Sequence, residues 1–271
     1  MFVGAHAVVT GGSSGIGLAC AKEFAARGAH VALVARDTGR LEIAAEAVEA
    51  ARRDPSQRVV IHSADLSSWE CARDAMDALA EEGFAPDILV NSAGVILPGE
   101  FATMSLADFE ANMTAGFWGV VHPCKAVVPR MIVAGSGHIV NVSSVAGFLG
   151  IYGYTGYAAA KYAVLGFSEA LRFELKPYGI TVAAVLPPDT DTPGLAREKT
   201  LRPTETEVVA GNIRAIPAER VAKAVMRGIA AKRFHIIPDA QSRFYFRLKG
   251  LLPEVFFRIV DRGVAKARRE K

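Results

Sequence analysis

At residues 7–17 the chain reads Ala7-Val8-Val9-Thr10-Gly11-Gly12-Ser13-Ser14-Gly15-Ile16-Gly17. A short apolar run passes here into a glycine cluster, and the apolar spacing of a helix begins at Ile16. Glycines at such a junction permit a tight turn and let the backbone approach a pyrophosphate, to which the helix presents free N–H groups. A tight turn without a ligand is the alternative, but a glycine loop between a strand and a helix is the context that a dinucleotide site requires. We therefore predict a dinucleotide site formed by Gly11, Ser13, Ser14, Gly15, Ile16 and Gly17.

Short apolar runs and helical patterns alternate along the chain. The pattern predicts strands over 6–10, 30–35, 58–62, 87–91, 138–143 and 181–186, and helices over 16–27, 40–53, 68–82, 107–133 and 157–176. This alternation predicts an α/β fold, a single doubly wound Rossmann-type domain whose parallel sheet has helices on both faces. We expect the catalytic domain to span residues 1–240, with a substrate loop at about 188–216, followed by an amphipathic, basic extension over 241–271.

Composition narrows the class of protein. The 271 residues are 51% hydrophobic and carry a net charge of +3, which suits a large core and gives no argument for nucleic acid binding. The cysteines are widely spaced and the histidines lack partners at ligand spacing, so we expect reduced thiols and no metal site. The sequence has no run of about 18 apolar residues, so we predict no membrane-spanning helix. Because the first strand begins almost at once, we expect no signal peptide and a cytoplasmic protein.

The ends of the second, third and fourth strands extend the predicted cofactor site. An acidic residue at the end of the second strand would bind a ribose and repel a 2′-phosphate, but the sequence has Arg36 there, with Asp37 next to it. A guanidinium binds phosphate with two hydrogen bonds, so NADP(H) is favoured over NAD(H), with a solvated Arg36 as the alternative. Asp65 and Leu66 are expected at the adenine, and the run Asn91-Ser92-Ala93-Gly94 places Asn91, Ala93 and Gly94 against the ribose.

A proton-transfer group is predicted from Ser144, Tyr157 and Lys161. An ordinary tyrosine has a pKa of about 10, too high for easy proton exchange at neutral pH. Lys161 lies one helical turn from Tyr157, and we expect its ammonium to lower that pKa and to hold the cofactor ribose. Tyr157 then donates a proton to a carbonyl oxygen as hydride arrives at the carbon, while Ser144 orients that oxygen. Tyr154 and Tyr162 have no lysine one turn further on, which favours Tyr157.

These motifs resemble those of the short-chain dehydrogenase/reductase family over about residues 5–235. Residues 10–17 are similar to the family's cofactor signature, residues 91–94 to its Asn-x-Ala-Gly, and residues 157–161 to its Tyr-x-x-x-Lys. The resemblance implies that Pro187, Thr190 and Thr192 line the nicotinamide, although Pro188 stands where the family usually has glycine.

One position departs from the family pattern. The family commonly carries an asparagine that holds a water between the lysine and a proton relay, and Gly116 occupies that position here. Asn112 lies one helical turn earlier on the same face and could substitute for the asparagine. Alternatively, a water fills the space at Gly116, or the relay is weak.

A resemblance to one branch of the family limits the class of substrate that we expect. Residues 33–36, 176–178 and 187–194 resemble the branch that reduces a lipophilic ketone, 3-ketodihydrosphingosine, with NADPH. A 3-oxoacyl thioester, a steroid or a xenobiotic carbonyl is the alternative substrate, and a nucleotide-binding regulator with little turnover is the alternative class. The apolar and basic residues of 241–271 could lie in a membrane interface, fold over the core or form a subunit contact. The family resemblance implies a homodimer or homotetramer.

Overall fold

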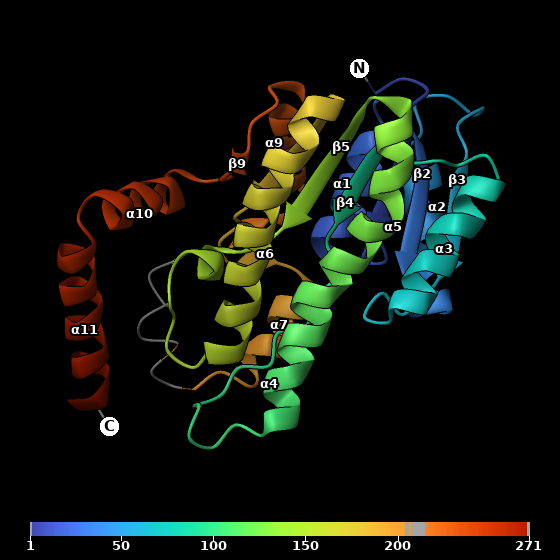
Figure 1. The fold of residues 1–271 in the computed structure, drawn as a ribbon. Helices are drawn as coiled ribbons and strands as arrows, with labels where there is room; N and C mark the ends of the chain where they lie inside the picture. Colours follow the sequence, from blue (N-terminus) through green and yellow to red (C-terminus); the bar gives the residue numbers. More distant parts are fainter. Residues whose placement is uncertain (1, 204–205, 207–214, 270–271) are drawn as a thin grey trace.

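The structure is a computed structural model that describes residues 2–203, 206 and 215–269. A seven-stranded sheet forms its centre, in the order β3-β2-β1-β4-β5-β6-β9, and neighbouring strands pair in parallel (Figure 1). The strands are β1 His6–Thr10, β2 His30–Ala35, β3 Val59–Ser63, β4 Ile88–Asn91, β5 Gly137–Val142, β6 Ile180–Val185 and β9 His235–Ile236.

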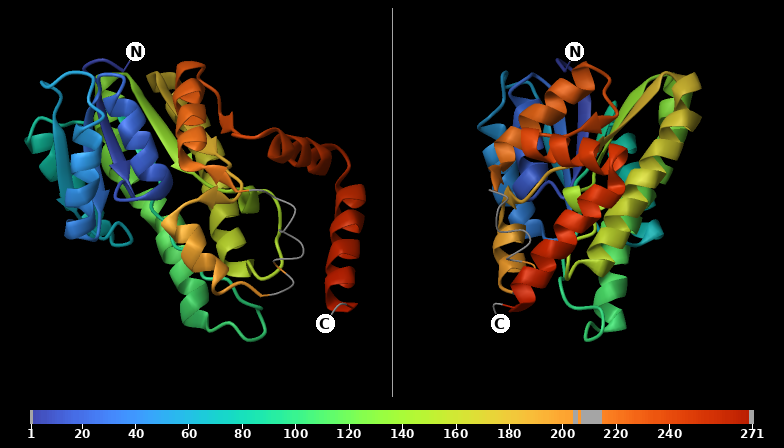
Figure 2. Two further views of the ribbon diagram at one scale, coloured as in Figure 1. Left: turned by 180° about the vertical axis from the view of Figure 1, so that it is seen from behind. Right: turned by 90° about the vertical axis from the view of Figure 1, so that its left-hand side faces the viewer.

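Two layers of helices enclose the sheet (Figures 1 and 2). The helices α1 Gly15–Ala25, α2 Thr38–Glu49 and α9 Ala218–Ala230 share one buried cluster, and α3 Trp69–Glu81, α5 Gly119–Ala134 and α6 Thr155–Leu175 share the other. In β2, Val31 and Leu33 belong to the first cluster, whereas Ala32 and Val34 belong to the second. A strand buried on both faces must be apolar at every position, and burial of each Val or Leu contributes roughly 1.5–3 kcal/mol. The predicted Rossmann-type α/β fold is confirmed.

The order of the strands places the loops that carry the predicted site at one edge. From β1 the chain moves outward to β2 and β3, and then returns to β4 on the other side of β1. Such a reversal opens a crevice at the carboxyl ends of the strands. The loops that follow β1, β4, β5 and β6 meet there, in the lower half of Figure 1.

The helix predicted over 107–133 is observed as α4 Leu106–Met113, a π-helical segment Thr114–Trp118 and α5, which follow one another without a gap. The prediction of a helix here is confirmed, and the π-helical segment is the feature that it did not include. The π segment contains Gly116, where a Cβ would lie 3.1 Å from the Cβ of Ala160 on α6. Glycine therefore permits close approach of the π-helical segment to α6.

The part of the chain that follows β6 was predicted least well. Residues 188–216 contain a two-stranded parallel pair, β7 Thr190–Asp191 with β8 Ile216–Pro217, and the short helix α7 Pro193–Lys199. Residues 204–205 and 207–214 of the predicted loop lie outside the described residues. The sequence analysis missed α9 and the edge strand β9.

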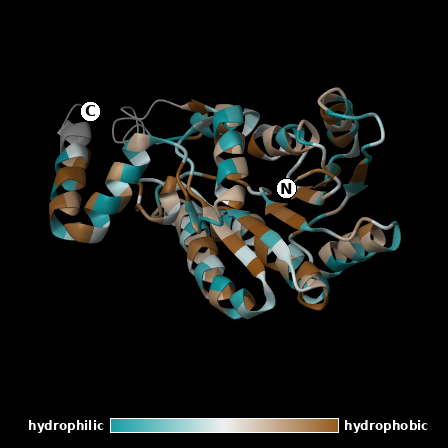
Figure 3. Cartoon of the chain, turned by 90° about the horizontal axis from the view of Figure 1, so that it is seen from above, coloured by the Kyte–Doolittle hydropathy of each residue, from teal (hydrophilic) through white to brown (hydrophobic). Residues whose placement is uncertain are grey.

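Two helices, α10 Ala240–Leu251 and α11 Pro253–Arg269, end the described chain and extend away from the β9 edge of the sheet (Figure 2). Figure 3 shows apolar and polar residues mixed along both of them. Lys249 of α10 ties the pair to the rest of the protein, since its ammonium donates to the Phe148 carbonyl oxygen and the Tyr162 hydroxyl, both at 2.6 Å. Within the described ranges, no helix has the length and apolar character needed to cross a membrane.

Candidate active site

The glycine loop packs so tightly that a side chain at Gly11 or Gly17 would clash with neighbouring backbone atoms. Gly11 has a φ of +63°, and a Cβ there would lie 2.7 Å from the amide nitrogen of Ala93 at the end of β4. A Cβ on Gly17 would overlap the carbonyl oxygen of Gly11. The loop after β1 is therefore folded tightly on itself and against residues 92–93, which brings two of the predicted cofactor segments together.

The N-terminus of α1 is open for hydrogen bonding. Ser14 occupies the N-cap position, but its side chain makes no capping hydrogen bond. The first N–H groups of α1 are thus left to a ligand, and the positive end of the helix dipole favours a phosphate. Gly15 lies against Thr192, whose methyl carbon would be 3.0 Å from an added Cβ. The predicted nicotinamide segment therefore adjoins the glycine loop.

That segment is fixed by main-chain and hydroxyl contacts. The amide of Val145 donates to the carbonyl oxygen of Pro187 at 2.9 Å. The hydroxyl of Thr190 donates to the carbonyl oxygen of Pro188 at 2.9 Å, and the hydroxyl of Thr192 accepts from the amide of Leu195 at the start of α7 at 3.2 Å. The residue after Ser144 and the predicted nicotinamide loop are thus held side by side.

The end of β2 separates the roles of Arg36 and Asp37. The Asp37 carboxylate caps α2 by accepting from the amide of Arg40 at 3.0 Å, and it pairs with the Arg40 side chain at 3.6 Å. Arg36 is exposed beside Asp65. The pKa of Asp65 is lowered mainly by its hydrogen bonds with Ser67, with a smaller contribution from Arg36. Asp37 is therefore engaged by its own helix, whereas Arg36, the residue that follows β2, is exposed.

A buried chain of polar side chains runs beneath the site. The Asn91 amide donates to the Asn141 side-chain oxygen at 2.9 Å, and the Asn141 amide donates to the Ser168 hydroxyl at 2.9 Å. Ser168 in turn donates to the carbonyl oxygen of Val164 at 2.6 Å. The chain links β4, β5 and α6, and so fixes α6, which carries Tyr157, against the sheet. Asn91 was predicted at the site, whereas Asn141 and Ser168 were missed because single polar residues in apolar segments give no spacing signal.

The structure brings Ser144, Tyr157 and Lys161 together. Ser144 follows β5 and caps a 3₁₀ turn over Val145–Gly147 by accepting from the amide of Ala146 at 3.1 Å. Tyr157 and Lys161 are buried on one face of α6, and the Lys161 ammonium lies 5.8 Å from the centre of the Tyr157 ring. This ammonium donates to the carbonyl oxygen of Val142 at 3.0 Å.

Burial is the largest cause of the pKa shifts of Tyr157 and Lys161. It raises the pKa of Tyr157, and a hydrogen bond with Ser144 offsets this rise only in part. It also lowers the pKa of Lys161 to about 8. Desolvation of the phenolate therefore gives Tyr157 a raised pKa, and the expectation that Lys161 lowers it stays a prediction.

The family model described as short chain dehydrogenase matches residues 5–202 of this chain. The chain belongs to the short-chain dehydrogenase/reductase family. A 3-ketodihydrosphingosine reductase from Bos taurus is 40% identical over 233 residues, which cover 86% of this chain and 70% of the relative.

Two solved short-chain dehydrogenases share the fold. One from Sphingobium yanoikuyae in complex with NADPH has a TM-score of 0.76 and 30% identity, covering 92% of this chain and 95% of its own. Another from Burkholderia phymatum in complex with NAD has a TM-score of 0.82 and 28% identity, covering 94% of this chain and 95% of its own. This short-chain dehydrogenase/reductase is an oxidoreductase of alcohol and carbonyl groups, for which a nicotinamide cofactor is expected.

The residues of this short-chain dehydrogenase/reductase fit a dinucleotide. The glycine loop and the open start of α1 suit a pyrophosphate. A Cβ on Gly94 would lie 3.5 Å from the Lys161 ammonium, so glycine keeps the space beside Lys161 clear. Among the described residues, no group of three or more His, Cys, Asp or Glu side chains could hold a metal ion.

The hydrogen-bond partners of Asn112 are not those that a proton relay to Lys161 would need. Its side chain is fully buried and forms a pair of hydrogen bonds with the main chain of Leu97, at 3.0 and 2.9 Å, and donates to the carbonyl oxygen of Asp108 at 3.0 Å. Asn112 therefore anchors the loop after β4 to α4. No hydrogen bond joins it to Lys161 in the described part of the chain.

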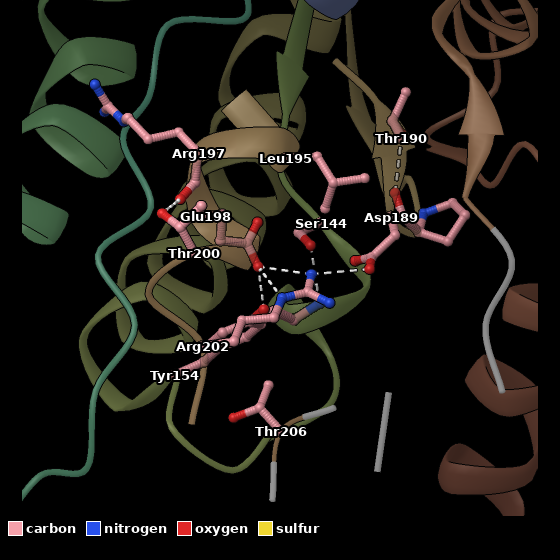
Figure 4. A network of polar contacts seen from close by, with 12 residues as sticks. Ser144, Tyr154, Asp189, Thr190, Leu195, Arg197, Glu198, Thr200, Arg202 and Thr206 are labelled. Atoms are coloured by element: carbon pink, nitrogen blue, oxygen red, sulfur yellow. Dashed lines mark hydrogen bonds and ion pairs between the residues drawn. The ribbon is translucent and has the colours of Figure 1, made fainter. Parts of the chain in front are cut away.

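A second polar group beside Tyr157 was missed by the sequence analysis. Arg202 lies between the carboxylates of Asp189 and Glu198, as Figure 4 shows, and Tyr154 donates a hydrogen bond to Glu198. Asp189, Glu198 and Arg202 all lie in the substrate loop predicted over 188–216, but none of them was predicted as a site residue. The spacing of four residues between Glu198 and Arg202, on α7 and the turn after it, was the available signal, since side chains at this spacing meet on a helix.

Proposed function

We propose that this protein reduces the keto group of a long-chain lipid with NADPH, with 3-ketodihydrosphingosine as the substrate and dihydrosphingosine as the product. The observation that carries the proposal is the apolar cluster that begins at the residue after Ser144. It contains Val145, Phe148, Leu149, Leu186 and Phe256, with Tyr245, Phe246 and Val260 packed against it. This cluster packs α10 and α11 against the residues that follow Ser144, and exposed apolar side chains of this C-terminal segment, among them Phe244, Leu252 and Phe257, suit an aliphatic chain. The likeness to the Bos taurus reductase supports the same substrate.

The chemistry assigns one role to each side chain. The nicotinamide supplies hydride to the carbonyl carbon when it is bound. Tyr157 donates its hydroxyl proton to the carbonyl oxygen, and Ser144 donates a hydrogen bond that orients the same oxygen. Lys161, held at Val142 beside Gly94, binds the ribose and supplies positive charge that stabilises the phenolate left on Tyr157.

The preference for NADPH rests on the end of β2. The carboxylate that would repel a 2′-phosphate is Asp37, and it is engaged in capping α2 and pairing with Arg40. The exposed guanidinium of Arg36 is thus the charge presented to the adenosine side of the site. Bidentate binding of phosphate by arginine supports the choice.

We further propose that residues 241–271 form an extension that lies in a membrane interface and admits the lipid, while residues 1–240 form the catalytic domain. Exposed apolar side chains line α10 and α11. Basic residues alternate with them: Arg243, Arg247, Arg258 and Arg262. This combination favours the surface of an anionic bilayer. A cytoplasmic homodimer or homotetramer is the assembly that the family resemblance supports.

The test is NADPH oxidation with detergent-dispersed 3-ketodihydrosphingosine, compared with a 3-oxoacyl thioester and a steroid ketone. We expect turnover of the sphingoid ketone and a loss of about 10²–10⁴-fold in kcat in Tyr157→Phe. Tyr178→Phe, at an exposed tyrosine beyond the end of α6, is the matched control and should keep wild-type turnover. Turnover of the thioester or steroid alone would contradict the proposed substrate.

A further inference from the structure

The Asp189 cluster, defined here as Asp189, Glu198, Arg202 and Tyr154, is a compact ionic group at the substrate side of the site (Figure 4). Arg202 donates to Asp189 at 2.8 Å and to Glu198 at 2.7 Å. Arg202 and Glu198 are only 5% and 3% exposed, whereas the Asp189 side chain is 26% exposed. Asp189 is therefore the member that a ligand can reach.

The charges of the cluster do not balance. Among the residues that the structure describes, these two carboxylates share one guanidinium, which leaves one negative charge in a largely desolvated place when both carboxylates are ionised. Lys161, the other buried cation near Tyr157, donates to Val142 and forms no ion pair with either carboxylate among the described residues. An uncompensated buried charge is costly, so the cluster is suited to a cationic partner.

The cluster lies beside the proton donor. The Tyr154 ring packs edge-on against the Tyr157 ring with their centres 5.8 Å apart, and the same Tyr154 donates to Glu198. Burial is the largest cause of the raised pKa of Tyr157, and the carboxylates of Glu198 and Asp189 raise it further. A ketone oxygen at Tyr157 would therefore place its neighbouring carbons near the cluster.

We propose that Asp189, supported by Glu198 and Arg202, binds the ammonium group of an α-amino ketone and so selects long-chain bases over neutral ketones. This inference rests on the proposed function, because 3-ketodihydrosphingosine carries its amino group on the carbon next to the ketone. The ammonium cancels the surplus negative charge of the cluster. A thioester or a steroid ketone has no cationic group, so the surplus negative charge of the carboxylates stays unpaired when such a ligand binds. This energetic cost lets the site discriminate against these ligands.

The bound ammonium also improves the proton donor. Part of the rise in the pKa of Tyr157 comes from Glu198 and Asp189, and a cation beside them offsets it. With an amino ketone in place, this part of the rise is expected to be smaller. The amino group is therefore expected to raise kcat as well as to lower KM.

The experiment compares 3-ketodihydrosphingosine with an analogue of the same chain length and hydroxyl group that lacks the amino group. The readout is the ratio of the two kcat/KM values within one enzyme preparation, which does not depend on the amount of folded protein. We expect a ratio of about ten or more in the wild type and a ratio near one in Asp189→Asn. Asp191→Asn, the same substitution at an exposed carboxylate on β7, should keep the wild-type ratio.

The outcomes separate the inference from the proposed function. Equal kcat/KM values for both ketones in the wild type, or an unchanged ratio in Asp189→Asn, would overturn ammonium recognition and leave the keto-reductase proposal standing. Failure of the wild type to reduce either ketone would remove the proposed function and the inference with it. If Asp189→Asn does not fold, Glu198→Gln decides by the same ratio, and Asp189→Glu is expected to restore part of the preference.

Discussion

Lys161 donates a hydrogen bond of 3.0 Å from its ammonium to the carbonyl oxygen of Val142, the last residue of β5. The next residue, Ser143, donates from its hydroxyl to the carbonyl oxygen of Lys161 at 2.7 Å. The end of β5 thus holds Lys161 at both its side chain and its main chain. Tyr157, one turn earlier on α6, is positioned by the same attachment.

The burial of Lys161 predicts a pH dependence of stability. Its pKa falls from 10.5 to about 8 on folding, so between these values the unfolded chain binds more protons than the folded one. Stability therefore rises with pH in this window, and the full penalty of burying the charge is present below about pH 8. Lys161→Met removes the penalty. The difference in unfolding free energy between wild type and variant should change by up to about 3 kcal/mol between pH 8 and 10.5, measured by urea denaturation. A difference that is constant with pH would contradict the buried, depressed lysine.

The exposed charge of Arg36 leads to a prediction about the preference for NADPH over NADH. In Arg36→Leu, the KM for NADPH should rise about tenfold or more, because the variant loses the charge that pairs with the 2′-phosphate. The KM for NADH should change little, since that cofactor has no such phosphate. Arg53→Leu, at an exposed arginine just beyond α2, is the matched control for general loss of positive charge. Equal effects of Arg36→Leu on both cofactors would count against its role.

Replacement of Gly17 is predicted to reduce both the stability of the protein and its affinity for the cofactor. A Cβ there meets the carbonyl oxygen of Gly11, so Gly17→Ala should cost about 1–3 kcal/mol of unfolding free energy and weaken NADPH binding. Gly166→Ala is the control, because Gly166 lies in α6 with nothing within 4 Å of an added Cβ. It should stabilise the protein by about 0.4–1 kcal/mol. Urea denaturation and fluorescence titration of NADPH measure the two effects, and an unaltered Gly17→Ala protein would refute the tight packing of the loop.

The buried chain through Asn141 predicts an energetic coupling. Asn141→Ala leaves the Asn91 amide and the Ser168 hydroxyl each without one partner, and should cost about 2–4 kcal/mol. Ser168→Ala removes only the far end of the chain and should cost less. A double-mutant cycle between Asn141 and Ser168 should show that their effects are not additive. Strict additivity would mean that the two side chains act independently.

The fold could be read largely from local pattern. The predicted strands at 6–10 and 30–35 coincide with β1 and β2, and the other predicted strand limits lie within one residue of the observed ones. Strands buried on both faces leave an apolar run with polar ends, which marks them clearly. The short edge strand β9 has only His235 and Ile236, too few residues to show such a run. The π-helical segment around Gly116 escaped prediction because a π turn keeps helical composition.

The site was predicted where short motifs carry the chemistry and missed where tertiary contacts do. Ser144, Tyr157 and Lys161 were placed together from spacing and residue type, and the structure brings them together. Tyr154 and Glu198 lie 44 residues apart in sequence, and only the fold makes them partners. The raised pKa of Tyr157 likewise depends on tertiary structure, since it follows from how deeply α6 buries the phenol.

The contact between Gly17 and the Gly11 carbonyl oxygen also bears on how this sequence can change over generations. The space at Gly17 is taken by the protein's own backbone, so selection for a folded chain is enough to keep glycine there even without a bound dinucleotide. A descendant that lost its catalytic activity would retain this residue for as long as it folded. Drift at Arg36, whose side chain is exposed and is not required by the packing of the loop, would instead record a change of cofactor.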